Sequence, residues 1–265
     1  MHASASSEPA RRGLRFRDEL RDFTHFVIRP TLGPRLAPRR LGGQVAADWL
    51  SGFGSGRLLK WALFLWAINL IFLGPIAVAA ATASGAEHRL NLQAIPWLQA
   101  LLWAPIVEEL VFRYSLRRIG HALWLVPVAT GIMLAGPGTT SILILLTVLL
   151  ICWSPWYGPG RMPSAQRSGG RSWSLRLRYR ALFPWVFHAA SLAFAGVHLH
   201  NFNLQQTGLW LLPLLVLPQW LTGLVLGWMR VRRGIGAAML LHGLFNGGPL
   251  LLVWLLLRLA PEMAM

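Results

Sequence analysis

Residues 103–118, WAPIVEELVFRYSLRR, place two adjacent carboxylates and an arginine inside an otherwise apolar helix. The carboxylates, Glu108 and Glu109, are the only ones of the nine acidic residues that lie within a long hydrophobic segment. A charged side chain near the centre of a bilayer costs roughly 2.5 to 3.5 kcal/mol even on permissive insertion scales, so such residues usually persist for a function. The stretch therefore predicts a membrane helix that carries a functional centre.

The composition of the chain also indicates a membrane protein. Of its 265 residues 55% are hydrophobic and only 13% are charged, the mean hydropathy is positive, and several of the 14 tryptophans stand near the ends of apolar runs. We predict an all-α, polytopic transmembrane helical bundle with the lipid bilayer as a partner. The net charge of +16 lies in short segments that flank apolar runs, which is typical of topology signals, so no nucleic-acid partner is expected. The single Cys152 excludes an intrachain disulfide and is expected to pack inside a span.

Residues 1–57 form a basic cytoplasmic amino-terminal arm, and residues 58–265 form the transmembrane domain. The arm contains no apolar run like that of a secretory signal peptide. Its apolar residues recur at roughly helical spacing among arginines, which favours an amphipathic helix on anionic lipid; a solvated basic tail is the alternative. These residues are Leu14, Phe16, Leu20, Phe23, Phe26 and Val27. Prolines within residues 30–38 then end the helix, and residues 48–56 are expected to form a short connector.

Seven apolar runs follow, and each is interpreted as a membrane span. They cover residues 61–83, 95–117, 122–135, 139–153, 181–199, 209–229 and 235–257. The third and fourth are short enough to be tilted or to form a hairpin, and a basic cytoplasmic loop is expected at 155–180. Because this loop, the arm and the turns after the second and sixth spans carry most of the arginines, the positive-inside rule places the amino terminus in the cytoplasm and the carboxyl terminus outside. The expected location is the bacterial plasma membrane.

Helical spacing predicts which polar residues inside the spans share a face. Glu109 and Arg113 are four positions apart and can pair, whereas Glu108 is rotated by about 100° and faces something else. His242 and Asn246 are also four apart and can point two polar groups at one spot. His198 follows an aromatic residue by one helical turn. We therefore expect a structural ion pair and a free carboxylate, Glu108.

These residues resemble the three motifs of the CPBP intramembrane protease family, which contains CAAX prenyl endopeptidases and bacteriocin-processing or self-immunity proteins of the Abi type. The motifs are Glu-Glu-x-x-x-Arg at 108–113, Phe-x-x-x-His at 194–198 and His-x-x-x-Asn at 242–246, in that order on separate spans. The resemblance covers residues 96–250 and leaves the arm outside. One departure is the hairpin and arginine-rich loop between the first two motifs, where the family usually has a short connection.

The resemblance implies a glutamate-dependent endopeptidase that cleaves a membrane-associated protein or peptide without a cofactor. Glu108, with His198, would orient and deprotonate a water molecule that attacks the scissile carbonyl, and Glu109 belongs to the catalytic motif as its neighbour. His242 and Asn246 would donate hydrogen bonds to the developing oxyanion. The glycine pairs at 223/227 and 243/247 are expected to serve helix packing.

Several alternatives stay open at this point. The same fold can serve as a catalytically silent membrane scaffold or a bacteriocin self-immunity protein, and buried carboxylates also occur in proton-coupled transporters, although no inverted repeat is present. The two glutamates could form an ion-pair network with Arg113 and its neighbours, and two histidines with a glutamate could bind zinc. Counted from the cytoplasmic ends, Glu108, His242 and His198 lie roughly 15, 10 and 25 Å deep, so they do not meet if every helix is upright. His188 lies closer to the depth of His242 and competes with His198.

Overall fold

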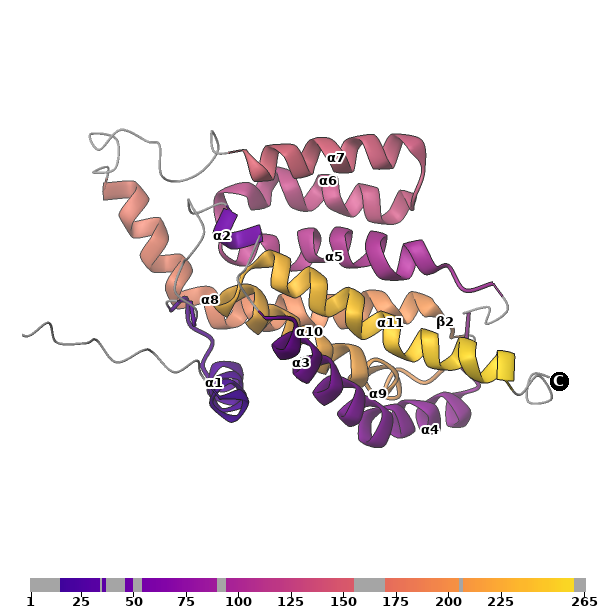
Figure 1. Ribbon diagram of the computed structural model, residues 1–265. Helices are drawn as coiled ribbons and strands as arrows, with labels where there is room; N and C mark the ends of the chain where they lie inside the picture. Colours follow the sequence, from indigo (N-terminus) through magenta and orange to yellow (C-terminus); the bar gives the residue numbers. More distant parts are fainter. Residues whose placement is uncertain are drawn as a thin grey trace, which may run out of the picture.

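The computed structural model describes residues 15–33, 35–36, 46–49, 54–89, 94–154, 170–204 and 207–259. These residues form a bundle of helices that run side by side (Figure 1). The α-helices are α1 (Phe16–Ile28), α2 (Ala46–Trp49), α3 (Ser55–Ile68), α4 (Gly74–Ser84), α5 (Ala104–Phe112), α6 (Ala122–Ala135), α7 (Thr139–Trp153), α8 (Gly170–Val197), α9 (Leu212–Leu215), α10 (Leu217–Arg232) and α11 (Ile235–Leu259). The π-helices are η1 (Asn69–Leu73) and η2 (Gln99–Trp103), and the 3-10 helices are η3 (Tyr114–Leu116), η4 (Ile119–His121) and η7 (His198–Asn201). Two short strands, β1 (Glu87–His88) and β2 (Phe202–Asn203), pair antiparallel.

The predicted all-α membrane bundle is confirmed. In the described part of the chain, three helical segments are long and apolar enough to cross a membrane: Ser55–Ser84, Ser174–Asn201 and Ile235–Leu259. The shorter apolar helices α6 and α7 contact each other and form the expected hairpin. Many large hydrophobic side chains on these helices are exposed, which suits a surface that faces lipid. The chain is therefore an integral membrane protein.

The two ends of the bundle carry different elements. Figure 1 places α1 and α2 at one end, and the turn between α6 and α7, the β1–β2 pair and the end of α11 at the other. Arg118, between η3 and η4, and the arginines at the end of α10 lie at the end that carries α1 and α2, since they bond to residues of those two helices. The strands pair Glu87 with Asn203 and His88 with Phe202, so they fasten the segment after α4 to the segment after η7.

The helix α1 of the amino-terminal arm is packed against the bundle. The apolar face of α1 is buried: Phe23 and Phe26 are 6% and 1% exposed, and the ring of Phe23 lies 5.7 Å from Trp61 and 5.9 Å from Trp228. The helix expected from the spacing of the apolar residues in the arm is present as α1, while residues 1–14 lie outside the described part of the chain. The contact of α1 with anionic lipid stays a prediction.

Two tryptophans near the ends of apolar runs lie inside the protein and not at a membrane boundary. Trp61 and Trp228 are fully buried, and their indole N–H groups donate to Glu19 at 2.9 Å and to Asp22 at 2.7 Å. The tryptophans thus connect α1 to α3 and α10. A buried indole N–H without a hydrogen-bond partner would destabilise the fold, so these two bonds are needed where the tryptophans are buried.

The prediction of a connector at residues 48–56 is wrong for residues 48 and 49, which are helical. Ala46–Trp49 form a short helix, and Asp48 is buried in contact with Arg35, Arg118 and Arg230, with 2.5 Å between Asp48 Oδ1 and Arg230 Nη1. Burial alone would raise the pKa of the Asp48 carboxyl, but the surrounding guanidinium groups outweigh burial and lower the pKa to about 2. Asp48 therefore fastens α2 to the end of α10 and to Arg118, which lies between η3 and η4.

The expected loop at 155–180 is partly helical. The helix α8 begins at Gly170, eleven residues before the start predicted for the fifth span, and it contains Pro184 in its interior. Figure 1 shows α8 changing direction along its length. Proline removes a backbone donor and clashes with the preceding turn, which is the usual cause of such a bend.

Glycines let α10 approach α8 closely. A Cβ atom on Gly223 would lie 3.1 Å from the ring of Phe194, and one on Gly227 would lie 2.7 Å from the ring of Phe187. The packing role expected for this glycine pair is confirmed. The contact also holds Phe194, which belongs to the site described next.

Candidate active site

The helix α5 begins after an irregular segment that leaves a backbone oxygen free. In the π-helix η2 each carbonyl oxygen accepts from the N–H group five residues later, and for Ala100 that residue is Pro105, which has no N–H. The side chain of Asn246 donates from Nδ2 to this oxygen at 3.0 Å. Close approach is possible because Gly243 has no side chain; a Cβ atom there would lie 2.8 Å from the oxygen of Leu101. Pro105 thus leaves the carbonyl oxygen of Ala100 free to accept the hydrogen bond by which α11 packs on this segment.

Glu109 is the centre of a fully buried cluster. Its Oε1 accepts from Arg113 Nη1 at 2.7 Å and lies 3.0 Å from His242 Nδ1. The guanidinium carbon of Arg113 lies 3.7 Å from the ring centre of Phe194, a cation–π contact. The ion pair predicted from the four-residue spacing is therefore present, and it links α5 to α8 and α11.

Glu108 faces another direction, as its rotation on the helix predicts. Its side chain is 16% exposed, against 0% for Glu109, and its Oε2 lies 3.8 Å from His242 Nε2. That oxygen has no hydrogen-bond partner among the described residues. Glu109 Oε2 also lacks a hydrogen-bond partner among the described residues, so exposure and not pairing separates the two: Glu108 is the carboxylate that lines a cavity.

The hydrogen bond of His198 fixes its tautomer. Its Nδ1 lies 2.7 Å from the backbone oxygen of Phe194, which can only accept, so Nδ1 carries the proton. In the neutral ring Nε2 is then a free acceptor. His198 is the first residue of η7, where α8 ends, and this position presents the ring to the interior of the bundle.

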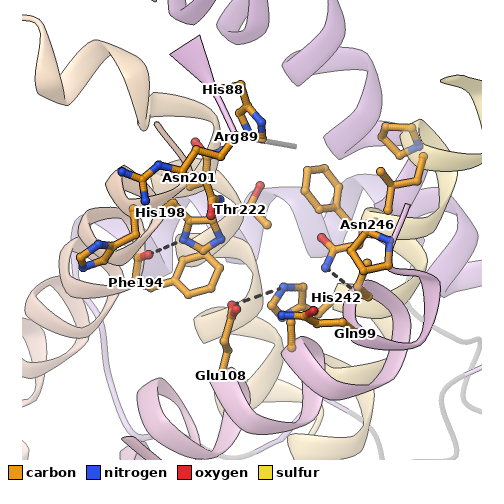
Figure 2. Close-up of a pocket in the computed structure, with 18 residues that line it drawn as sticks. His88, Arg89, Gln99, Glu108, Phe194, His198, Asn201, Thr222, His242 and Asn246 are labelled. Carbon is orange, nitrogen blue, oxygen red and sulfur yellow. Dashed lines mark hydrogen bonds and ion pairs between the residues drawn. The ribbon is translucent and has the colours of Figure 1, made fainter. Parts of the chain in front are cut away.

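A cavity of about 580 Å³ lies inside the bundle and reaches one of its ends. Glu108, His198, His242 and Asn246 all line it, and Figure 2 shows their side chains converging from α5, η7 and α11. Glu109 and Arg113 lie behind this lining. Further polar residues that line the cavity were not predicted from the sequence: His88, Arg89, Gln99, His200, Asn201, Gln219 and Thr222. The sequence offered one signal for these residues: Arg89 is one of the few charged residues on the side of the membrane opposite the arginine-rich loops.

The depths counted for upright helices do not hold, because all three predicted residues line one cavity. His242 touches the carboxylate of Glu109, and the ring of Phe194 lies 5.7 Å from His242 and 4.6 Å from His198. The bend of α8 explains the difference, since a helix that changes direction does not gain depth at a constant rate. His188 is not in the lining, so it is His198 that the fold brings to Glu108.

The described residues include no group of three or more His, Cys, Asp or Glu side chains placed to hold a metal ion. The Nδ1 atoms of His242 and His198 bond to Glu109 and to a carbonyl, so Nε2 is the remaining ring nitrogen of each.

A helical membrane bundle with carboxylates, imidazoles and an amide around an internal cavity defines a polytopic membrane protein with a buried polar site. More narrowly, the chain belongs to the type II CAAX prenyl endopeptidase Rce1-like family, whose model matches residues 90–248, more than half of the chain. The resemblance drawn from the three motifs is thus confirmed, and the family is one of membrane-embedded proteases. Neither the curated proteins nor the solved structures give a match.

Proposed function

We propose that this protein is a glutamate-dependent intramembrane endopeptidase that cleaves a membrane-associated protein or peptide by activating water. The observation that carries the proposal is the difference between the two carboxylates. Glu109 is fully buried and bound by Arg113 and His242, whereas Glu108 makes no hydrogen bond among the described residues, lines the cavity and has a side chain that is 16% exposed. Membership of a peptidase family supports the same reaction.

Glu108 and His198 act on the water molecule. The carboxylate of Glu108 and Nε2 of His198 are acceptors on the wall of one cavity, so a water between them donates one hydrogen bond to each and attacks the peptide carbonyl carbon through its oxygen. Glu108 takes the proton as the carbon–oxygen bond forms, and then transfers it to the amine that leaves. The carboxylate is restored at the end of the cycle.

His242 and Asn246 stabilise the oxyanion. Asn246 uses one N–H for Ala100 and retains a second for the substrate. In its imidazolium form His242 donates through Nδ1 to Glu109 and through Nε2 to the oxyanion. Arg113 and this imidazolium then balance the charges of the two carboxylates, which is the condition for burying four ionised groups together.

The cavity opens on the outer side of the membrane in this proposal. The arginines that the positive-inside rule assigns to the cytoplasm lie beside α1 and α2, whereas the exposed lining residues Arg89 and His200 lie at the β1–β2 end. The substrate would then be a peptide or protein segment reached from outside the cytoplasm, in keeping with a plasma-membrane protein.

The experiment is a comparison of peptides released from membranes that contain the parent protein or Glu108→Gln. We expect cleavage products with the parent and none with the variant, at equal levels of inserted protein. The matched control is Glu87→Gln, an exposed carboxylate on β1 outside the cavity, which should retain cleavage. Equal products from parent and Glu108→Gln membranes would instead favour the silent scaffold or self-immunity protein of the same fold, or a transporter.

The proposal includes a site without metal, which is tested by measuring the same cleavage products after chelation. Activity should survive exhaustive chelation, and elemental analysis of the purified protein should find no stoichiometric zinc. Under the zinc alternative, His198→Ala and His242→Ala would each lose bound metal together with activity.

A further inference from the structure

Four arginines gather around Asp48 at the end of the bundle that carries α1 and α2 (Figure 1). Three of them, Arg35, Arg118 and Arg230, make ion pairs with its carboxylate. The fourth, Arg117, lies within electrostatic reach of Arg35, Arg230 and Asp48. We call these four residues the arginine cluster. None of them lines the catalytic cavity, which reaches the other end of the bundle.

The arginine cluster holds more positive charge than its carboxylate can balance. Four guanidinium groups face one carboxylate, and a guanidinium stays charged at any physiological pH. The ion-paired side chains are largely enclosed, with Arg230 at 0%, Arg118 at 11% and Arg35 at 15% exposure. Repulsion between enclosed charges is screened much less than repulsion at an open surface. An anion from outside the chain would therefore stabilise this end of the bundle.

The neighbouring carboxylates of the described residues are bound to other arginines. Glu19 on α1 pairs with Arg233, and Asp22 on the same helix pairs with Arg232. Residues 37–45, which lie between the arm helices in sequence, add two arginines and no acidic residue. The missing negative charge is thus not supplied by these parts of the protein.

The turn between η3 and η4 places two adjacent arginines at the rim of the cluster. Arg117 Nη2 donates to the backbone oxygen of Gly33, and Gly33 also leaves room for α10, since a Cβ atom there would lie 2.6 Å from Arg232 Nη1. A guanidinium has five N–H donors. Among the described residues, Gly33 is the one hydrogen-bond partner of the Arg117 side chain, and Asp48 is that of Arg118. Both arginines are half-buried, so their remaining donors can serve a ligand at the rim.

The chemistry and the position of the cluster together indicate a phosphate group. Arginine binds phosphate through two parallel N–H groups, and one phosphate offers several acceptor oxygens with its negative charge. The cluster lies at an end of the membrane bundle, which is the level of the lipid phosphates, and basic sites between helices at this level bind anionic headgroups. A zwitterionic headgroup fits less well, because its cationic part would be repelled.

We propose that the arginine cluster binds the phosphate group of an anionic phospholipid, with Arg117 and Arg118 donating to the phosphate oxygens. This site differs from the lipid contact predicted for the surface of α1, because its residues come from the segment after α1, from the turn after η3 and from α10. It also does not depend on the reaction at Glu108. The lipid would join the arm to the bundle.

The first test measures thermal unfolding of the parent protein in detergent with added lipid. Phosphatidylglycerol should raise the melting temperature by about 5 °C at a hundredfold excess over its Kd, whereas phosphatidylcholine and inorganic phosphate at the same concentration should have little effect. An equal rise with phosphatidylcholine would overturn the proposal. An equal rise with inorganic phosphate would overturn the lipid as the ligand and assign the site to a soluble phosphate compound.

The second test counts bound lipid by native mass spectrometry. The parent should retain one phosphatidylglycerol per chain in competition with phosphatidylcholine. Arg117→Gln and Arg118→Gln should each weaken binding about fivefold, and the double variant about thirtyfold. The matched control is Arg21→Gln, an exposed arginine on α1 outside the cluster, which should bind as the parent does.

Two results of this second test would contradict the site. An equal loss in Arg21→Gln would mean that lipid is attracted by the basic surface in general, and full retention in the double variant would remove the cluster from lipid binding. Circular dichroism checks that each variant is folded. Arg118→Gln leaves the bond from Arg117 to Gly33 in place, so it tests the site even if Arg117→Gln does not fold.

Discussion

At the scale of single residues, the site separates two carboxylates that are neighbours in sequence. Glu109 is enclosed by Arg113, His242 and the cation–π contact of Arg113 with Phe194, while Glu108 lines the cavity and is 16% exposed. A rotation of about 100° between consecutive helix positions is sufficient to produce this difference. Glu109, which is fully buried, gives the site its geometry, and Glu108, which lines the cavity, is left for chemistry.

Replacement of Asn246 by alanine tests the oxyanion assignment. We expect turnover to fall roughly a hundredfold or more with little change in substrate affinity, since the amide would bind the transition state and not the ground state. Because Asn246 also donates to Ala100, a stability loss of about 1 kcal/mol should accompany the change. Kinetics and thermal unfolding in detergent measure the two effects separately. A fully active Asn246→Ala protein would remove this residue from the site.

Replacement of Arg113 by leucine tests the buried ion pair. Glu109 would keep His242 but lose its guanidinium, and removing one partner of a buried ion pair costs about 3 to 5 kcal/mol, so the melting temperature in detergent should fall markedly. Arg113→Lys keeps the charge and should lose less stability. If Arg113→Leu and the parent melt at the same temperature, the pair does not contribute to the fold.

At the scale of elements, the helices differ in how far the sequence could predict them. The pairing of Glu109 with Arg113 was predictable because both residues lie on one helix, where spacing alone fixes the shared face. The burial of Asp48 was not, because its partner Arg230 is 182 positions away and periodicity carries no information on such contacts. The meeting of His198 with Glu108 also escaped prediction, since it depends on the course of α8 and on its bend.

The arm offers a test of such a long-range contact through Asp48. Its pKa of about 2, against 3.8 for the free side chain, means that ionised Asp48 contributes stability above about pH 4 and loses it as the pH falls towards 2; the contribution is about 2 kcal/mol at neutral pH. Asp48→Asn should therefore be less stable than the parent at pH 7, and the difference should shrink between pH 4 and 2. Thermal unfolding in detergent across this range measures it. A difference that is the same at pH 7 and pH 3 would mean that the charge of Asp48 is not what holds the arm.

At the scale of the whole molecule, the β1–β2 pair connects the mouth of the cavity to the residues of the candidate active site. It lies at the end of the bundle opposite α1 and α2, it holds Arg89 at the mouth of the cavity, and it connects to η7, which carries His198. The basic arm and the arginines that bind it occupy the other end. The side of the membrane that each end faces thus decides which peptides can reach Glu108.

This orientation is tested by cysteine labelling. The parent has one cysteine, the buried Cys152, so Cys152→Ala gives an unlabelled background in which Glu87→Cys marks the β1–β2 end and Ser174→Cys marks the arm end. Both chosen positions are exposed. Because the positive-inside rule puts the arginine-rich end in the cytoplasm, a membrane-impermeant maleimide added to intact cells should label Glu87→Cys at once and Ser174→Cys only after the membrane is permeabilised. Labelling of both in detergent confirms that each thiol can react. The reverse order in intact cells would turn the mouth of the cavity towards the cytoplasm, and its substrates would then be cytoplasmic peptides.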